Sequence, residues 1–141
     1  MKKLILAAMI AISATASAAP IINVYKSPTC GCCGAWIKHL RDNGLEIAAH
    51  DVANPGEMRA KMGMPEEMGS CHTAVVEGYA IEGHVPASDI KRLLSSRPKA
   101  IGLAVPGMPL GSPGMEADRK DAYNVYLVAA GKPVKVFKRY S

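Results

Sequence analysis

Residues 21–44, IINVYKSPTCGCCGAWIKHLRDNG, decide the fold of this chain. The segment from Ile21 to Tyr25 is an apolar run of strand length, and Ser27-Pro28 after it are turn residues. Apolar side chains then recur at the spacing of one helical face, at Cys33, Trp36, Ile37 and Leu40. Gly44 supplies a stop for this helix. The stretch therefore predicts a strand that leads into a helix, with three cysteines at the start of the helix.

Further strands and helices are predicted after this unit. They are, in order, a strand over 45–52, a short helix over 57–62, two hairpin strands over 73–76 and 79–82, and a helix over 86–97. The order β-α-β-(α)-β-β-α is typical of the thioredoxin-like sandwich, an α/β fold in which helices flank a mixed sheet.

The remainder of the chain adds a long loop and a terminal hairpin. Residues 100–121 are rich in glycine and proline and contain a small repeat, Pro106-Gly107-Met108 and Pro113-Gly114-Met115. Loops of this length inside a compact domain are usually functional or disordered. Residues 123–129 and 134–140 alternate apolar and basic side chains, which predicts a hairpin whose lysines protect a solvated sheet edge.

The first residues predict export from the cytoplasm. Lys2 and Lys3 precede an uncharged stretch from Leu4 to Ile12, and small residues follow through Ala16-Ser17-Ala18. This is the pattern of a secretory signal peptide with an Ala-x-Ala cleavage site. A membrane anchor is less consistent with it, because the apolar core is about half the ~20 residues that cross a bilayer. We expect a signal peptide at residues 1–18, a single domain at residues 19–141, and a periplasmic protein.

The charge balance argues against nucleic acid as a partner. The formal net charge is +5, and removal of Lys2 and Lys3 with the leader lowers it to +3. Such a small excess gives no basis for a phosphate-binding surface. No long apolar run follows the leader, so we expect no membrane anchor after cleavage.

The four cysteines predict a local chemical site rather than a network of cross-links. Cys30, Cys32 and Cys33 crowd into four residues, and Cys71 lies directly before a predicted strand. Cross-links stabilise most when they join distant segments, which this spacing does not favour. In a thioredoxin-like fold the loop before that strand lies beside the helix start, so we expect all four sulfur atoms to converge.

Clustered thiolates favour copper(I), a soft ion. Zinc fits less well, because adjacent cysteines rarely fill two corners of one zinc site. His72, beside Cys71, is the best additional ligand candidate, although a histidine bonded to the backbone is an equal alternative. Met108 and Met115 offer neutral, soft thioethers, and an apolar plug over the sheet is their alternative role. We expect His39, His50 and His84 to be structural or surface residues.

At this point the chain resembles a known family, the periplasmic copper-resistance proteins of the CopG type, formerly a domain of unknown function. The matching segments are 27–33 (SPTCGCC), 70–73 (SCHT), 83–86 (GHVP), 102–109 (GLAVPGMP) and 111–116 (GSPGME). The resemblance implies a thioredoxin-like fold, a role in copper tolerance, and copper bound by Cys30, Cys32, Cys33 and Cys71, a multinuclear copper(I) cluster being one form. It also implies interconversion of copper(I) and copper(II), with a copper efflux system or a periplasmic copper chaperone as partner.

Two other functions stay open at the level of sequence. Cys30 and Cys33 have the Cys-x-x-Cys spacing of a thiol-disulfide oxidoreductase, in which the first thiolate attacks and the second resolves. Alternatively, the cysteines brace a small envelope domain through disulfides and carry no chemistry. An oxidoreductase activity on copper is one interpretation of the resemblance, and the residues alone do not decide between catalysis and storage.

Overall fold

The computed structural model describes residues 17–141, so residues 1–16 of the expected signal peptide lie outside the described residues. Within the described part the helices are α1 (Gly31–Asp42), α2 (Gly56–Lys61) and α3 (Ala87–Ser96), with a short 3-10 helix, η1 (Glu66–Met68). The strands are β1 (Ile21–Lys26), β2 (Glu46–Asp51), β3 (His72–Val76), β4 (Tyr79–Glu82), β5 (Gly102–Ala104), β6 (Tyr123–Val128) and β7 (Lys135–Tyr140). Every helix between residues 17 and 141 is too short or too polar to span a bilayer.

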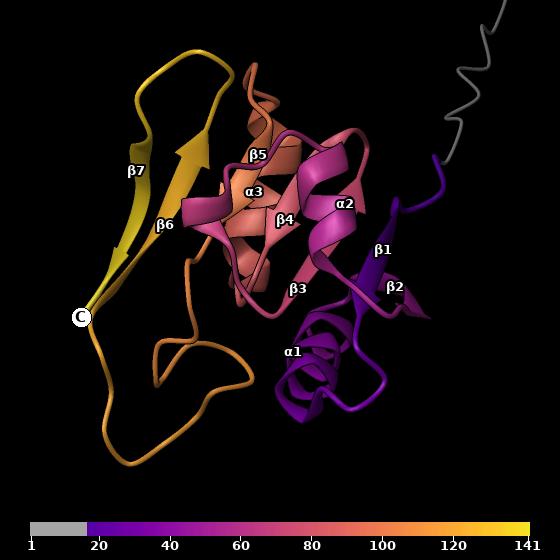
Figure 1. The fold of residues 1–141 in the computed structure, drawn as a ribbon, viewed down its shortest axis with the longest axis vertical. Helices are drawn as coiled ribbons and strands as arrows, with labels where there is room; N and C mark the ends of the chain where they lie inside the picture. The colour runs from indigo at the N-terminus through magenta and orange to yellow at the C-terminus, as the bar shows by residue number, and fades with distance from the viewer. Residues whose placement is uncertain (1–16) are drawn as a thin grey trace, which may run out of the picture.

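The strands form one mixed sheet in the order β2-β1-β3-β4-β5-β6-β7 (Figure 1). β1 and β2 are parallel and are joined through α1, which is the predicted βαβ unit. β3 pairs antiparallel with β1 and with β4, and α3 follows β4. The predicted thioredoxin-like sandwich is therefore confirmed, together with the terminal hairpin of β6 and β7.

The sheet has an apolar core on each face. The larger core packs α1 and α3 against one face, because Trp36 and Leu40 of α1 meet Ile90 and Leu93 of α3 over the strands. The smaller core, around Met64, lies under the segment of α2 and η1 and includes buried alanines of β4 and β5. Successive residues of β4 point to opposite cores, as strand geometry requires.

One prediction about the long loop was wrong. Residues 102–104 are not part of an irregular loop but form β5, which is parallel to β4 and antiparallel to β6. β5 is only three residues long, and its glycine lies in a stretch full of loop-forming residues, so local composition concealed it. Through β5 the terminal hairpin joins the main sheet, while the rest of the loop descends below the sheet toward α1 (Figure 1).

The terminal hairpin is also fixed to α3. The Tyr140 hydroxyl donates a hydrogen bond to Asp89 at 2.7 Å. The Arg92 guanidinium lies 3.6 Å from the ring centre of Phe137 and donates a hydrogen bond to the Phe137 carbonyl oxygen. β7 is the edge strand of the sheet, and the lysines on it are consistent with the predicted protection of that edge.

Gly102 provides a test of the β4–β5 junction. A Cβ at this position would stand 1.7 Å from the Ala80 carbonyl oxygen, so Gly102→Ala must separate the two strands. We expect it to lower the free energy of unfolding by about 3 kcal/mol or more, the upper part of the range for overpacking. Urea denaturation of Gly102→Ala and of Gly34→Ala measures this effect.

The control variant changes a helical glycine with open space around it. A Cβ at Gly34 meets nothing within 4 Å, so Gly34→Ala should leave stability unchanged or raise it by about 0.5–1 kcal/mol. Equal stability of the two variants would contradict the close contact between Gly102 and Ala80.

Candidate metal centre

The start of α1 presents three cysteines at the end of the sheet. Cys30 is the N-cap residue, and its side chain does not cap the helix. Cys33 is fully buried on the apolar face of α1 beside Trp36. Cys30 and Cys33 are joined by a disulfide, whereas Cys32 and Cys71 are free thiols. The helix N-terminus, with its unpaired N–H groups, favours negative charge on sulfur at this place.

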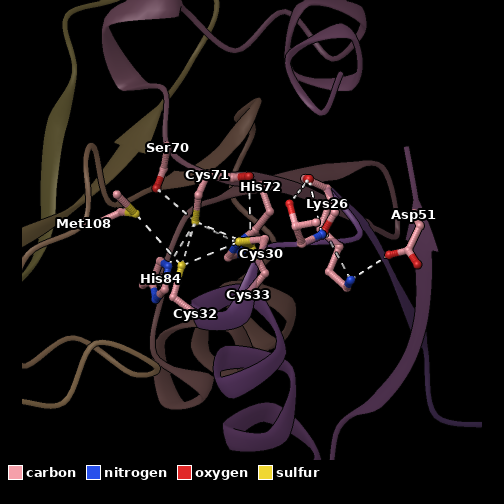
Figure 2. The surroundings of a disulfide bond; sticks show 12 residues. Lys26, Cys30, Cys32, Cys33, Asp51, Ser70, Cys71, His72, His84 and Met108 are labelled. Atoms are coloured by element: carbon pink, nitrogen blue, oxygen red, sulfur yellow. Dashed lines mark hydrogen bonds and ion pairs between the residues drawn. A yellow bond between two sulfur atoms is a disulfide. The ribbon is translucent and has the colours of Figure 1, made fainter. Parts of the chain in front are cut away.

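Cys71 lies directly before β3, and its side chain reaches the three cysteines at the start of α1 (Figure 2). Its Sγ atom lies 3.6 Å from Sγ of Cys33 and 3.9 Å from Sγ of Cys32. Sγ of Cys32 is 3.6 Å from Sγ of Cys30, and all four sulfur atoms lie within 4.8 Å of one another. The predicted convergence of the four cysteine sulfur atoms is confirmed. It follows from the pairing of β1 with β3, because this register places the residue before β3 beside the residue that follows β1.

A buried carboxylate fixes the segment that carries Cys71. Glu82, at the end of β4, is fully buried and accepts a hydrogen bond from the backbone N–H of Ser70 at 2.8 Å. It also accepts hydrogen bonds from the Thr73 hydroxyl at 2.6 Å and from the Arg59 guanidinium at 3.1 Å. Burial raises the pKa of Glu82, but all three partners are donors, which oppose that shift and suit an ionised carboxylate. Glu82 therefore holds the chain on both sides of Cys71.

The Cys71 thiol contacts a nitrogen atom of each of two imidazole rings. Nδ1 of His72 is 3.3 Å from Cys71 Sγ, and Nε2 of His84 is 3.1 Å from it. Burial, followed by the nearby Cys32, raises the pKa of Cys71 to about 12. The resting thiol is therefore protonated at neutral pH, and it can donate its proton to a ring nitrogen that carries a lone pair.

The hydrogen bond to Pro113 determines which nitrogen of His84 carries a lone pair. Nδ1 of His84 lies 2.7 Å from the Pro113 carbonyl oxygen. A carbonyl can only accept, so Nδ1 holds the proton, and Nε2 of the neutral ring accepts from Cys71. Burial lowers the pKa of His84, which keeps the ring neutral. His84 was expected to be a structural or surface residue, and it is fully buried against Cys71; its place in the family segment 83–86 was the signal that could have singled it out.

His72 is buried with a ring nitrogen that has no partner. Its ring packs 4.3 Å from the Trp36 ring centre, and its Nε2 has no hydrogen bond within residues 17–141. Burial and the neighbouring His84 lower the pKa of His72 to about 3, so this ring is neutral as well. Buried polar atoms are rarely left unpaired in proteins. A weaker interaction with the Gly83 backbone acts on the pKa of His72 in the opposite direction, which is consistent with the alternative role predicted for this residue, a side chain bonded to the backbone.

The two loop methionines differ in their relation to the sulfur cluster. Sδ of Met108 lies 4.0 Å from Sγ of Cys32, and its side chain is 50% exposed. Hydrogen bonds from the Ser70 hydroxyl to the Gly107 carbonyl oxygen and from the Gly107 N–H to the Gly69 carbonyl oxygen attach this part of the loop to the Cys71 segment. Met115 is half-buried in a turn closed on Gly111, and within residues 17–141 no such sulfur contact is found for it.

The turn around Gly114 covers one side of the cluster. A Cβ on Gly114 would stand 2.8 Å from the Cys32 carbonyl oxygen and 3.2 Å from Nδ1 of His84. The turn therefore lies directly on the helix start and on the histidine, with room for glycine only. The long loop is thus part of the site, as its length suggested.

Comparisons with known proteins agree with this geometry. The family model described as "Protein of unknown function, DUF411" matches residues 68–115, which contain Cys71, both histidines of the site and the long loop as far as Met115. The solved structure "Copper resistance protein copG- Form 2" has 45% identity and a TM-score of 0.83, and the alignment covers 88% of this chain and 100% of that chain. For "Copper resistance protein copG- Form 1" the identity is 46% and the TM-score 0.80, with 85% and 96% of the chains covered. No curated protein sequence matches.

Glu82 can be tested through stability. Glu82→Ala leaves the Ser70 N–H and the buried Thr73 hydroxyl without an acceptor and leaves Arg59 paired only with Glu66, so we expect the free energy of unfolding to fall by at least about 2 kcal/mol. Glu46→Ala, at an exposed position of β2, is the control and should change stability by less than about 0.5 kcal/mol. Chemical denaturation of both variants measures the difference. A loss below about 1 kcal/mol in Glu82→Ala would contradict the role given to the carboxylate.

Proposed function

Because this chain belongs to the family of the CopG copper-resistance proteins, we propose that it acts in copper resistance by binding copper(I) through four cysteines. The ligands are Cys30, Cys32, Cys33 and Cys71, after reduction of the Cys30–Cys33 disulfide. The observation that carries this proposal is the meeting of four sulfur atoms within 4.8 Å, three from the start of α1 and one from the segment before β3. Thiolates are the ligands that copper(I) prefers, and bridging thiolates allow several ions to share one cluster.

The disulfide gives the site two ligand states. The oxidised state has two free thiols, and the reduced state has four. Conversion of the first into the second consumes two electrons and two protons. Copper(I) is bound in the reduced state, since a disulfide sulfur no longer offers the thiolate that the metal needs. The redox condition of the cysteines therefore controls copper(I) capacity.

The two free thiols also support interconversion of copper(II) and copper(I). Sγ atoms of Cys32 and Cys71 are 3.9 Å apart. If both thiols lose their protons and join as a disulfide, the two electrons released reduce two copper(II) ions to two copper(I) ions. The protein would then act as an oxidoreductase on copper, with a thiol reductant required to restore it.

Met108 is the additional ligand that the contacts favour. Its thioether is neutral and soft, lies 4.0 Å from Cys32, and sits at the exposed side of the cluster. Such a ligand binds copper(I) weakly enough to release it and resists the oxidation that removes thiols. For Met115 the apolar role, closing the turn over the site, fits its half-buried position better.

The predicted leader places this chemistry in the periplasm. Disulfide formation at the site is consistent with an oxidising compartment. Copper(I) bound there would pass to or from a copper efflux system or a periplasmic copper chaperone, and the exposed Met108 side of the cluster is the surface available for that exchange.

Copper(I) titration tests the main proposal. We expect the reduced protein, titrated without oxygen, to retain at least one copper(I) per chain in competition with a chromophoric copper(I) chelator. Cys71→Ser removes the sulfur atom that contacts both Cys32 and Cys33 from the segment before β3. The copper(I) affinity of this variant should fall at least about 100-fold, the magnitude that loss of strong metal ligation suggests. Retention of no copper(I) by the reduced wild-type protein would remove the proposal.

A thiol-disulfide oxidoreductase is the second candidate function. The disulfide between Cys30 and Cys33 occupies the first turn of α1, where a thiolate is stabilised, and Sγ of Cys32 stands 3.6 Å from Sγ of Cys30. A third thiol at that distance can attack a mixed disulfide formed on Cys30, which argues against clean exchange with a substrate protein.

Reduction of a model protein disulfide separates the two functions. On the copper proposal, we expect the reduced protein to reduce insulin no faster than a small dithiol at the same thiol concentration. Rapid turnover that Cys30→Ser abolishes and Cys71→Ser leaves intact would instead favour the oxidoreductase. The measurement is the rate of insulin precipitation with excess reductant.

A further inference from the structure

We propose that an apolar groove beside the terminal hairpin is a docking site for an acidic amphipathic helix of a partner protein. The groove lies on the face of the sheet that carries the smaller core, opposite α1 and α3. None of the residues that line it belongs to the sulfur cluster. The inference therefore goes beyond the proposed function, and the docking itself needs no copper.

Three segments of the chain line the groove, which has a volume of about 620 Å³. Ile101 and Val128 lie at its base, because both pack into the smaller core. Residues 62–67 form one side, and the loop 129–134 between β6 and β7 forms the other. A second hollow of about 280 Å³ shares Ile101 and part of that loop, and it extends the groove toward Lys99. The occupant is therefore elongated.

The apolar surface at this place is exposed and has no cover. Val134, at the side of the groove, is 37% exposed, and Val136 on β7 is 41% exposed. They are two of the four large apolar side chains exposed between residues 17 and 141. In the same part of the chain α2 lies over β3 and β4, whereas the hairpin extends beyond it (Figure 1). Contiguous exposed apolar surface of this kind usually marks an interaction site.

The shape of the groove favours a helix over an added strand or a small ligand. The free edge of β7 carries lysines, and the Phe137 carbonyl oxygen already accepts a hydrogen bond from Arg92, so strand addition is opposed there. The groove lies on the face of the sheet instead, and an amphipathic helix seats its apolar side in such a groove. Because the groove is open to solvent, a small apolar ligand would stay partly in water, whereas a helix covers the opening.

The charges around the groove select an acidic partner. Lys99 and Lys132 line the two hollows, and Glu67 is the acidic residue among those that line them. Residues 122–141, which include the hairpin, hold four basic side chains and no acidic one. Carboxylates beside the apolar face of a bound helix would meet these cations, whereas a second copy of this chain would bring like charges together. Charge complementarity therefore favours a different, acidic protein over self-association.

The groove is connected through η1 to the exposed side of the sulfur cluster. Residues 62–67 lead into η1, and the carbonyl oxygen of Gly69, directly after η1, accepts a hydrogen bond from the Gly107 N–H at 3.1 Å. Met108 follows Gly107 in the chain. A partner docked in the groove would therefore stand next to the Met108 side of the molecule, and its part in copper(I) exchange is the one element that rests on the proposed function.

A synthetic peptide tests the docking site. The probe is a helix of about 18 residues with leucines on one face and glutamates on the rest, since much shorter helices are marginal in water. The disulfide form of the protein, without copper, is titrated with this peptide and followed by amide NMR. We expect shifts concentrated at Ile101, Val128 and Val134, and binding that weakens as salt is added. A peptide with lysine at every glutamate position should leave the spectrum unchanged.

Matched charge reversals distinguish the groove from the other face of the hairpin. Lys132→Glu should weaken peptide binding at least about threefold, the size expected when a surface ion pair becomes a repulsion. Lys138→Glu changes the net charge equally, but Lys138 lies opposite Val125, on the face toward α3, so this variant should bind as the wild type does. Val134→Glu removes an apolar contact and adds a like charge, and it should weaken binding at least about tenfold.

Other results would overturn the proposal. Amide shifts outside the groove, or equal losses in Lys132→Glu and Lys138→Glu, would show unspecific attraction between charges. Dimerisation of the protein alone, detected by sedimentation velocity and abolished by Val134→Glu, would assign the groove to a second copy. Phosphatidylglycerol vesicles that move the groove amides, where the acidic peptide does not, would assign it to a membrane surface.

The absence of copper from these titrations keeps the two proposals independent. A protein that binds the peptide but retains no copper(I) would support the docking site and remove the four-cysteine proposal. A protein that retains copper(I) but does not bind the peptide would remove the docking site alone.

Discussion

The buried Glu82 carboxylate is the interaction on which the rest of the site depends. Its three donors come from α2, from the backbone before Cys71, and from β3 after it. Because an unpaired charge in the interior is so unfavourable, these groups stay together, and Cys71 has little freedom. The position of the Cys71 sulfur therefore depends on an ion pair that lies directly beside the segment carrying it.

The sulfur atom of Cys71 has close neighbours of two kinds. Sγ of Cys71 lies within 4 Å of the sulfur atoms of Cys32 and Cys33, and it also contacts a ring nitrogen of His72 and one of His84. Reduction of the Cys30–Cys33 disulfide adds thiolates on one side of it, while the imidazoles stay on the other. The same pocket thus presents mostly sulfur or a mixture of nitrogen and sulfur, according to its redox state.

Much of the fold and the centre of the site could be predicted from residue spacing. The apolar periodicity of 21–44 and the hairpin turn at Glu77-Gly78 define the sandwich, and the position of Cys71 before a strand predicts the meeting of the cysteines. β5 could not be predicted, because three residues give too little periodicity and its partners are distant in sequence. The position of His84 beside Cys71 was missed, although the segment 83–86 carries the family resemblance, because its contact with Pro113 joins segments distant in sequence.

The position of the Gly114 turn has a further consequence for how the molecule works. One flank of the sulfur cluster is sealed by backbone with no room even for a methyl group, and the floor is closed by Trp36 and the sheet. The remaining flank carries Met108, half of whose side chain faces solvent. A copper ion bound as proposed would therefore be most accessible to solvent, and to a partner protein, on the side of Met108.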